Sequence, residues 1–212
     1  MLKEIERCVY YSFKENILFE ITADKDKALV IKRVGDKKHF SKNEIKKKLS
    51  IEYLRSLDIF FNKYDFETWG NTVPEDKDYV RVDYKGLSCF MYDDAELLAD
   101  IRRYFNACIN ETAECKVLYF HSFDGGGPEY SFETEVKGIF TWYCERRYAK
   151  AGHEQLCGAG YDVIYSLYPL RKGKATAKIT SFSPICPAEN LRLFVETDEE
   201  LRINYRFEDI TE

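Results

Sequence analysis

The hydrophobic periodicity changes near the middle of the chain, and this change constrains the fold more than any other feature of the sequence. Before residue 110, two segments place apolar residues at helical spacing, whereas after residue 114 no segment does. The later part has instead seven short segments rich in β-branched and aromatic residues. The polar stretch 110–114 separates the two patterns. We therefore predict two domains, over residues 1–110 and 114–212.

The first predicted domain alternates hairpins with helices. Strand-like segments are found at residues 8–13, 17–23, 28–34, 79–84 and 87–92. One helix is predicted between residues 50 and 64, and a second after Asp93, because Leu97, Leu98, Ile101 and Phe105 share one helical face. We interpret this order as ββαββα, an antiparallel sheet with two helices on one face.

The charge pattern argues against nucleic acid as a partner. The net charge is −5, and the only basic cluster is Lys42, Lys46, Lys47 and Lys48, in a segment that also holds Glu44. A duplex-binding protein needs a basic stripe that neutralises phosphates. We interpret the cluster as the solvated start of a helix. The aromatic residues Tyr79, Tyr84, Phe90 and Tyr92 could stack bases, but core packing is the simpler interpretation.

The second predicted domain is an immunoglobulin-like β-sandwich. Its predicted strands cover residues 116–123, 130–136, 139–148, 161–168, 174–182, 191–196 and 201–207. Seven short strands at regular spacing are typical of such a sandwich, although the Cys–Trp–Cys pattern of antibody domains is missing. The complete prediction is an α+β domain followed by an all-β sandwich.

The cysteines and the hydropathy favour the cytoplasm. The N-terminal residues lack the apolar core of a signal peptide, and no stretch reaches the length of a membrane span. Seven cysteines, an odd number, fit free thiols in a reducing compartment. We expect a cytoplasmic protein that does not bind a membrane.

Three glycine- or proline-containing loops of the second domain are the predicted binding site. They cover residues 124–130, 157–161 and 181–187, and two predicted strands separate each loop from the next. In an antiparallel sandwich such loops emerge at the same end, where a rigid scaffold displays them to a partner. The predicted binding residues are Asp124, Gly125, Gly126, Gly127, Pro128, Glu129, Tyr130, Cys157, Gly158, Gly160, Tyr161, Ser183, Pro184 and Ile185.

The glycines of these loops allow more than one interpretation. Glycine is the usual residue where a turn needs a positive φ. Three in succession, Gly125–Gly127, could also permit close approach of a partner's backbone or form a bulge. Phosphate binding is excluded, because no G-x-x-x-x-G-K-[ST] motif occurs and the triplet precedes a strand rather than a helix.

The order of these loops resembles the chagasin-type inhibitors of papain-like cysteine proteases. In that family an immunoglobulin-like sandwich presents three same-end loops of the forms NPTTGY, GxGG and RPW. The matching positions here are Gly126-Gly127-Pro128-Glu129-Tyr130, Gly158-Ala159-Gly160-Tyr161 and Ser183-Pro184-Ile185. The spacing and glycines match, over about 70 residues, but the threonine, arginine and tryptophan of the family motifs are absent. The resemblance implies a protease as the partner.

No catalytic or metal-binding motif stands out. CxxC is absent, and the four residues that could hold zinc within one domain are Cys144, His153, Cys157 and Cys186. His153 could approach Cys157 as a base beside a thiol, whereas His121 lies in a strand. We therefore expect a non-enzymatic, cofactor-free module that binds a protein. The alternative is an enzyme or metal protein centred on His153, Cys157 and Cys186.

Overall fold

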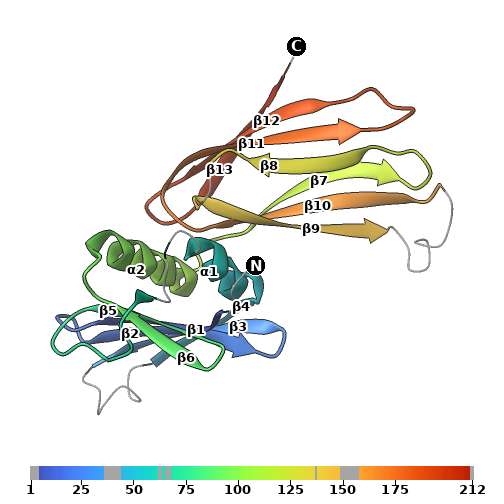
Figure 1. The fold of residues 1–212 in the computed structure, drawn as a ribbon. Coiled ribbons are helices and arrows are strands. Elements are labelled where there is room, and N and C mark those ends of the chain that lie inside the picture. The colour runs from blue at the N-terminus through green and yellow to red at the C-terminus, as the bar shows by residue number, and fades with distance from the viewer. Residues whose placement is uncertain are drawn as a thin grey trace. The chain divides into compact units, whose positions relative to one another are not determined.

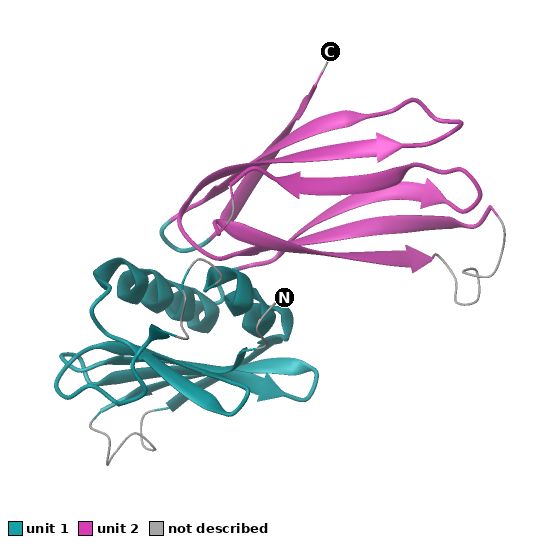
Figure 2. Cartoon of the chain, viewed as in Figure 1, with its two compact units in different colours: residues 1–113, 199–201 teal, residues 114–198, 202–212 magenta. Residues whose placement is uncertain are grey.

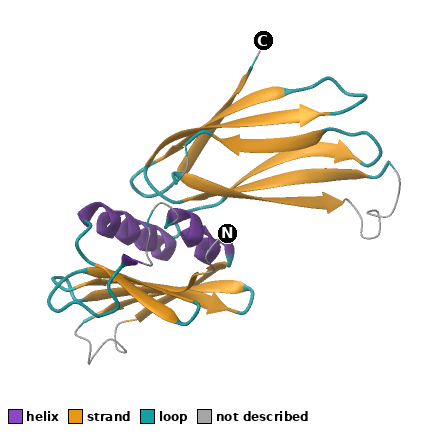
Figure 3. Ribbon diagram, viewed as in Figure 1, coloured by secondary structure: helices purple, strands orange, loops and turns teal. Residues whose placement is uncertain are grey.

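The chain is mostly antiparallel β-sheet with two helices, an α+β fold (Figures 1 and 3). The computed structural model describes residues 5–35, 44–61, 64, 68–136, 138–148 and 158–210. The chain forms two compact units (Figure 2). Unit 1 comprises residues 1–113 and 199–201, and unit 2 comprises residues 114–198 and 202–212. Neither helix is long and apolar enough to cross a membrane.

Unit 1 is a six-stranded antiparallel sheet with two helices on one face (Figure 1). Its elements are β1 (Ile5–Ser12), β2 (Ile17–Asp24), β3 (Lys27–Val34), β4 (Glu44–Ser50), α1 (Glu52–Phe60), β5 (Tyr79–Tyr84), β6 (Leu87–Met91) and α2 (Ala95–Asn110). The strands lie in the order β4-β3-β2-β1-β5-β6. Phe19 of the sheet stacks on Phe105 of α2, with 5.6 Å between the ring centroids. The apolar residues at helical spacing thus pack against the sheet in the core of unit 1.

The predicted ββαββα order is wrong, because four strands rather than two precede α1. The segment interpreted as a helix start is strand β4, in which Lys46 and Lys48 lie opposite Ile31 and Leu29 of β3. Strand β4 forms one edge of the sheet. Lysines on an edge strand keep it hydrated and discourage pairing with other chains. Because lysines replace apolar residues in β4, its sequence lacks the clear apolar alternation by which strands are recognised. Lys42 lies outside the described residues.

Helix α2 begins one residue later than predicted and has a defined end. Its N-cap is Asp94, whose side chain accepts a hydrogen bond from the Leu97 N–H at 2.9 Å. Glu111 ends the helix in the left-handed conformation, with φ 59°. Both cap residues, Asp94 and Glu111, are polar and lie just outside the helical run of apolar residues.

An ionic ladder, defined as Arg7, Glu20, Arg33 and Glu44, crosses unit 1 on the sheet face opposite the helices. Glu20 lies beside Phe19 in β2, so side-chain alternation directs it away from α2. Its carboxylate lies 2.7 Å from Arg7 and 2.8 Å from Arg33, and Arg33 lies 2.6 Å from Glu44. Opposite charges on neighbouring strands stabilise a sheet. The ladder links β1, β2, β3 and β4.

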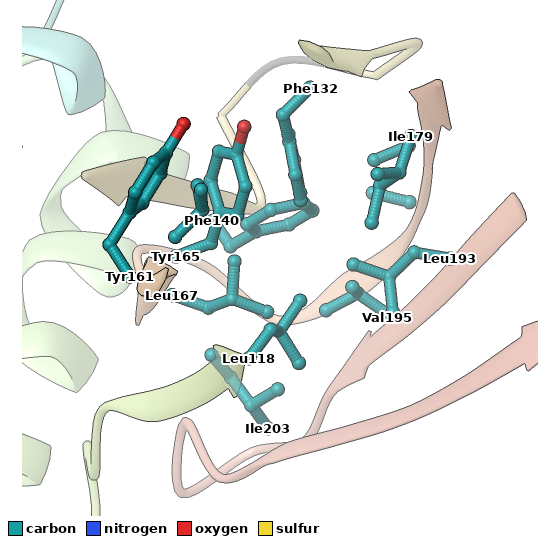
Figure 4. Packing of buried hydrophobic residues seen from close by; sticks show 13 residues of the cluster. Leu118, Phe132, Phe140, Tyr161, Tyr165, Leu167, Ile179, Leu193, Val195 and Ile203 are labelled. Carbon is teal, nitrogen blue, oxygen red and sulfur yellow. The ribbon is translucent and has the colours of Figure 1, made fainter. Parts of the chain in front are cut away.

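Unit 2 consists of two antiparallel sheets around one core (Figure 4). Its strands are β7 (Lys116–Phe123), β8 (Glu129–Thr134), β9 (Phe140–Tyr148), β10 (Gly160–Pro169), β11 (Gly173–Phe182), β12 (Asn190–Thr197) and β13 (Ile203–Asp209). One sheet has the order β7-β10-β9, and the other β13-β12-β11-β8. Leu167 of the first sheet and Leu193 of the second are fully buried in the shared core. The seven predicted strand segments are strands here, with bounds that differ by at most two residues.

Candidate functional site at the tip of unit 2

Three loops lie together at one end of unit 2, and we call them the tip (Figure 1). They are residues 124–128 between β7 and β8, residues 158–159 before β10, and residues 183–189 between β11 and β12. The Asp124 N–H donates to the Ala159 carbonyl at 3.0 Å, which joins the first loop to the second. The Ser183 hydroxyl donates to the Gly126 carbonyl at 2.7 Å, which joins the first loop to the third.

The backbone conformation of the tip itself requires glycine at positions 125–127. Gly125 and Gly126 have φ angles of 90° and 141°, a region that residues with a side chain rarely adopt. A Cβ on Gly127 would lie 2.4 Å from the Phe123 nitrogen, so only glycine fits against this strand end. Turn geometry and close packing within the chain therefore explain all three glycines. A partner's backbone is not needed to account for them.

Ser183 organises the third loop. Its hydroxyl oxygen accepts hydrogen bonds from the Cys186 N–H at 2.9 Å and the Ile185 N–H at 3.2 Å, in addition to donating to Gly126. Ser181 closes the base of the loop, because its hydroxyl accepts the Glu189 N–H at 2.8 Å. Such side-chain bonds to backbone stabilise a turn without regular secondary structure. The hydrogen bonds of Ser183 and Ser181 thus stabilise the conformation of the third loop.

Large apolar side chains are exposed on this framework. Phe182 is 72% exposed and Ile185 is 68% exposed, the two highest values among the large apolar residues that the structure describes. The Ile185 side chain lies over Gly126, where a Cβ would be 3.2 Å from its Cδ1. Phe182 was not among the predicted binding residues. Strand alternation could have identified it, because Ile179 and Ser181 of β11 are buried and the next residue must face the opposite side.

Several predicted binding residues support the tip from within. Tyr161 is buried and packs against Tyr148, with 5.2 Å between ring centroids. Tyr130 packs against Phe120 at 4.8 Å and is half-buried. Gly127 is also buried. These residues shape the tip rather than present a surface.

The remaining predicted residues lie on the outside. Gly125, Glu129, Gly158 and Pro184 are exposed, and Asp124 and Pro128 are half-buried. Asp124 also accepts a hydrogen bond from the Tyr148 hydroxyl at 3.4 Å. Glu129 lies opposite Phe182 in the β8–β11 register. Carboxylates thus flank the exposed apolar side chains.

The candidate metal and thiol residues are only partly placed. His153 and Cys157 lie outside the described residues. Cys186 is a free, half-buried thiol in the third loop, whereas Cys144 lies within β9 opposite Tyr165. In the part of the chain that the structure describes, no group of three or more His, Cys, Asp or Glu side chains could hold a metal. Cys144 is exposed, and partial desolvation raises the pKa of its thiol, which disfavours the thiolate that a metal ligand needs.

Two further predictions from the sequence concern side-chain exposure. Tyr79, Tyr84 and Phe90 of unit 1 are buried, so their rings are packed rather than free to stack bases. His121 is exposed on β7, and its Nδ1 lies 3.3 Å from Asp162 on the neighbouring strand β10. That contact is a cross-strand pair on the sheet surface.

Comparison with known proteins found no relative that could explain these features. No family model matches the chain. No curated protein matches it significantly. No solved structure matches it significantly either. The function must therefore be argued from the geometry.

Proposed function

We propose that unit 2 is an immunoglobulin-like sandwich whose tip binds a protein partner without catalysing a reaction. One observation carries the proposal. The two most exposed large apolar side chains of the described residues are Phe182, the last residue of β11, and Ile185, in the third loop, whose backbone is fixed by hydrogen bonds within the tip. Exposed apolar side chains on a rigid framework are typical of binding surfaces.

The strand connections support the immunoglobulin-like part of the proposal. In that fold, strands B, E and D are neighbours in one sheet and strands G, F and C in the other. Strands β7 to β12 follow the same scheme in chain order, since β7-β10-β9 corresponds to B-E-D and β12-β11-β8 to G-F-C. Strand β13 adds a further strand beside G. The tip loops then occupy the B–C, D–E and F–G positions.

The loop geometry supports recognition of a folded protein. The first and third loops require little ordering upon binding, because Ser183 and the glycines already determine their conformation. A preorganised surface loses less conformational entropy when it binds. Phe182 and Ile185 would bury apolar area in the centre of the contact, with Glu129 and Asp124 at its edge.

A papain-like cysteine protease is the first partner to test, because the three loops occupy the positions that the resemblance to chagasin-type inhibitors implies. A Cβ on Gly127 would clash with the Phe123 backbone, and a Cβ on Gly160 would lie 3.3 Å from the His121 side chain. The missing arginine and tryptophan are replaced by Ser183 and Ile185. Titration of such a protease with the full chain measures inhibition directly. A protease that keeps full activity at high concentrations of the chain would limit the proposal to other proteins.

The binding proposal is tested by affinity capture from the host's lysate with three baits. The first is the native chain, and the second carries Phe182→Asp and Ile185→Asp. The control carries Leu87→Asp and Val73→Asp in unit 1, because these side chains are also highly exposed, at 57% and 52%. We expect the native and control baits to capture the same protein in equal amounts. We expect the tip variant to capture at least about tenfold less of it. Equal recovery with all three folded baits would contradict the proposal.

A further inference from the structure

The outer edge of strand β13 is open in unit 2. Strand β13 is the last strand of its sheet and pairs with β12 alone among the strands that the structure describes. The residues 204–209 are all exposed. Tyr205 and Phe207 remain 42% and 41% exposed, although alternation places them on the same face as the core residues Val195 and Leu193 of β12. An open edge with aromatic side chains is a template for another strand.

The sequence of β13 is complementary to itself in one antiparallel register. If two copies pair with Phe207 opposite Phe207, then Arg206 of each copy lies opposite Glu208 of the other. Side chains directly opposite in an antiparallel pair share a face, with Cβ atoms about 4.5–5.5 Å apart. The two Phe207 rings would therefore meet on one face, and two Arg206–Glu208 pairs would form on the other. The neighbouring registers centred on Arg206 or Glu208 place like charges opposite each other.

Both charged side chains are available for this exchange. Arg206 already contacts Glu208 of its own strand, and both side chains are exposed, at 66% and 48%. Arg206 also lies over the Phe194 ring of β12, 4.3 Å from its centroid. The contact with Phe194 holds the guanidinium on the outer face of the sheet, which is the face that the pairing requires.

We propose that two copies of this chain associate through β13 in the Phe207-centred register, so that the two four-stranded sheets form one continuous sheet. A two-fold axis generates such a contact from a single patch. A seven-residue strand is expected to bury less than the roughly 1,200 Å² of a stable complex, so we expect a weak dimer. This inference is independent of the proposed function of the tip.

Charge reversal tests the register with the full chain. Sedimentation equilibrium of the native chain between about 10 μM and 1 mM is expected to give a monomer–dimer equilibrium. Arg206→Glu alone, or Glu208→Arg alone, places like charges opposite each other twice, and each variant should dimerise at least about tenfold more weakly. An equimolar mixture of the two variants should form a heterodimer, because every pair is then of opposite charge. Lys178→Glu, an exposed change on the inner strand β11, should leave the equilibrium unchanged.

The outcomes are decisive in both directions. Two single variants that remain monomeric and a mixture that dimerises would support the register. A native chain that stays monomeric up to about 1 mM would overturn the proposal. A dimer that survives both substitutions, or a mixture that is not rescued although circular dichroism shows folded variants, would exclude this register.

Discussion

The two units are both built from antiparallel strands, but they treat their exposed surfaces differently. Unit 1 pairs its charges across the sheet through the ionic ladder and places lysines on its edge strand β4. Unit 2 exposes Phe182 at the end of β11, Ile185 in the third tip loop and Phe207 on its edge strand β13. A surface satisfied by its own side chains contributes to stability and discourages association. A surface that leaves apolar area open on a fixed backbone is suited to a partner.

The largest expected effect tests whether the units fold separately. Phe105→Ala removes a fully buried ring from unit 1, and we expect its free energy of unfolding to fall by about 3–5 kcal/mol. Trp69 lies in unit 1 and Trp142 in unit 2. Denaturation can therefore be followed for each unit, with Trp142→Phe or Trp69→Phe to leave one fluorescent reporter. A loss of equal size in both units would show that they unfold together.

The next effect sharpens the account of the tip. Gly127→Ala forces a Cβ against the Phe123 backbone, and overpacking of this kind costs about 1–3 kcal/mol. The matched control is Gly158→Ala, where φ is +78° but no neighbouring atom of the described residues lies within 4 Å of the added Cβ, so only backbone strain of about 1 kcal/mol is expected. Chemical denaturation of unit 2 measures both. If Gly127→Ala lowers the free energy of unfolding no more than Gly158→Ala does, the close packing at Gly127 is not required.

A smaller effect tests the ionic ladder. Glu20→Gln removes the charge between Arg7 and Arg33, and we expect a loss of about 1–2 kcal/mol because the Glu20 side chain is only 11% exposed. Glu145→Gln is the control, since this residue pairs with Arg147 on an exposed surface and should cost less than about 0.5 kcal/mol. Urea denaturation at low and high salt distinguishes the two. Equal costs would mean that the ladder is not stronger than an ordinary surface pair.

The smallest effect is a pH dependence that belongs to unit 1. Hydrogen bonds from Lys46 and Arg33 lower the pKa of Glu44 in the folded state. The unfolded chain therefore takes up the proton first as the pH falls, and the stability that the carboxylate contributes is present above its unfolded pKa and is lost in acid. We expect Glu44→Gln to lower stability above about pH 5 and to make no difference below about pH 3. A difference that grows in acid would have the wrong sign.

The strands of unit 2 were predictable from the sequence, whereas β4 was not. Alternating residues such as Ala175, Ala177 and Ile179 show directly which face of β11 is buried. In β4, lysines occupy the three central positions of a hydrated edge strand, so its pairing with β3 depends on neighbours that a local pattern does not contain. Tertiary context overrides local pattern most strongly at such edges.

The tip was predictable in its position but not in its chemistry. Counting strands places the three loops at one end, and hydrogen bonds such as Ser183 to Gly126 join them there. The local pattern did not show that Gly127 packs against Phe123, because that contact depends on the backbone conformation of the turn. It also did not show that Tyr161 is buried against Tyr148, because that contact depends on which strands are neighbours. The predicted list therefore mixed residues that shape the tip with residues that a partner could touch.

Site-specific photo-crosslinking tests the central claim, that the tip is the binding surface, most directly. A photoreactive phenylalanine analogue would replace Phe182 in one sample and Leu87 in another, since both side chains are exposed and they belong to different units. The account predicts one discrete adduct from position 182, with the same protein that the native chain captures, and none from position 87. An adduct from position 87 alone, or none from position 182 while the native chain still captures that protein, would contradict it.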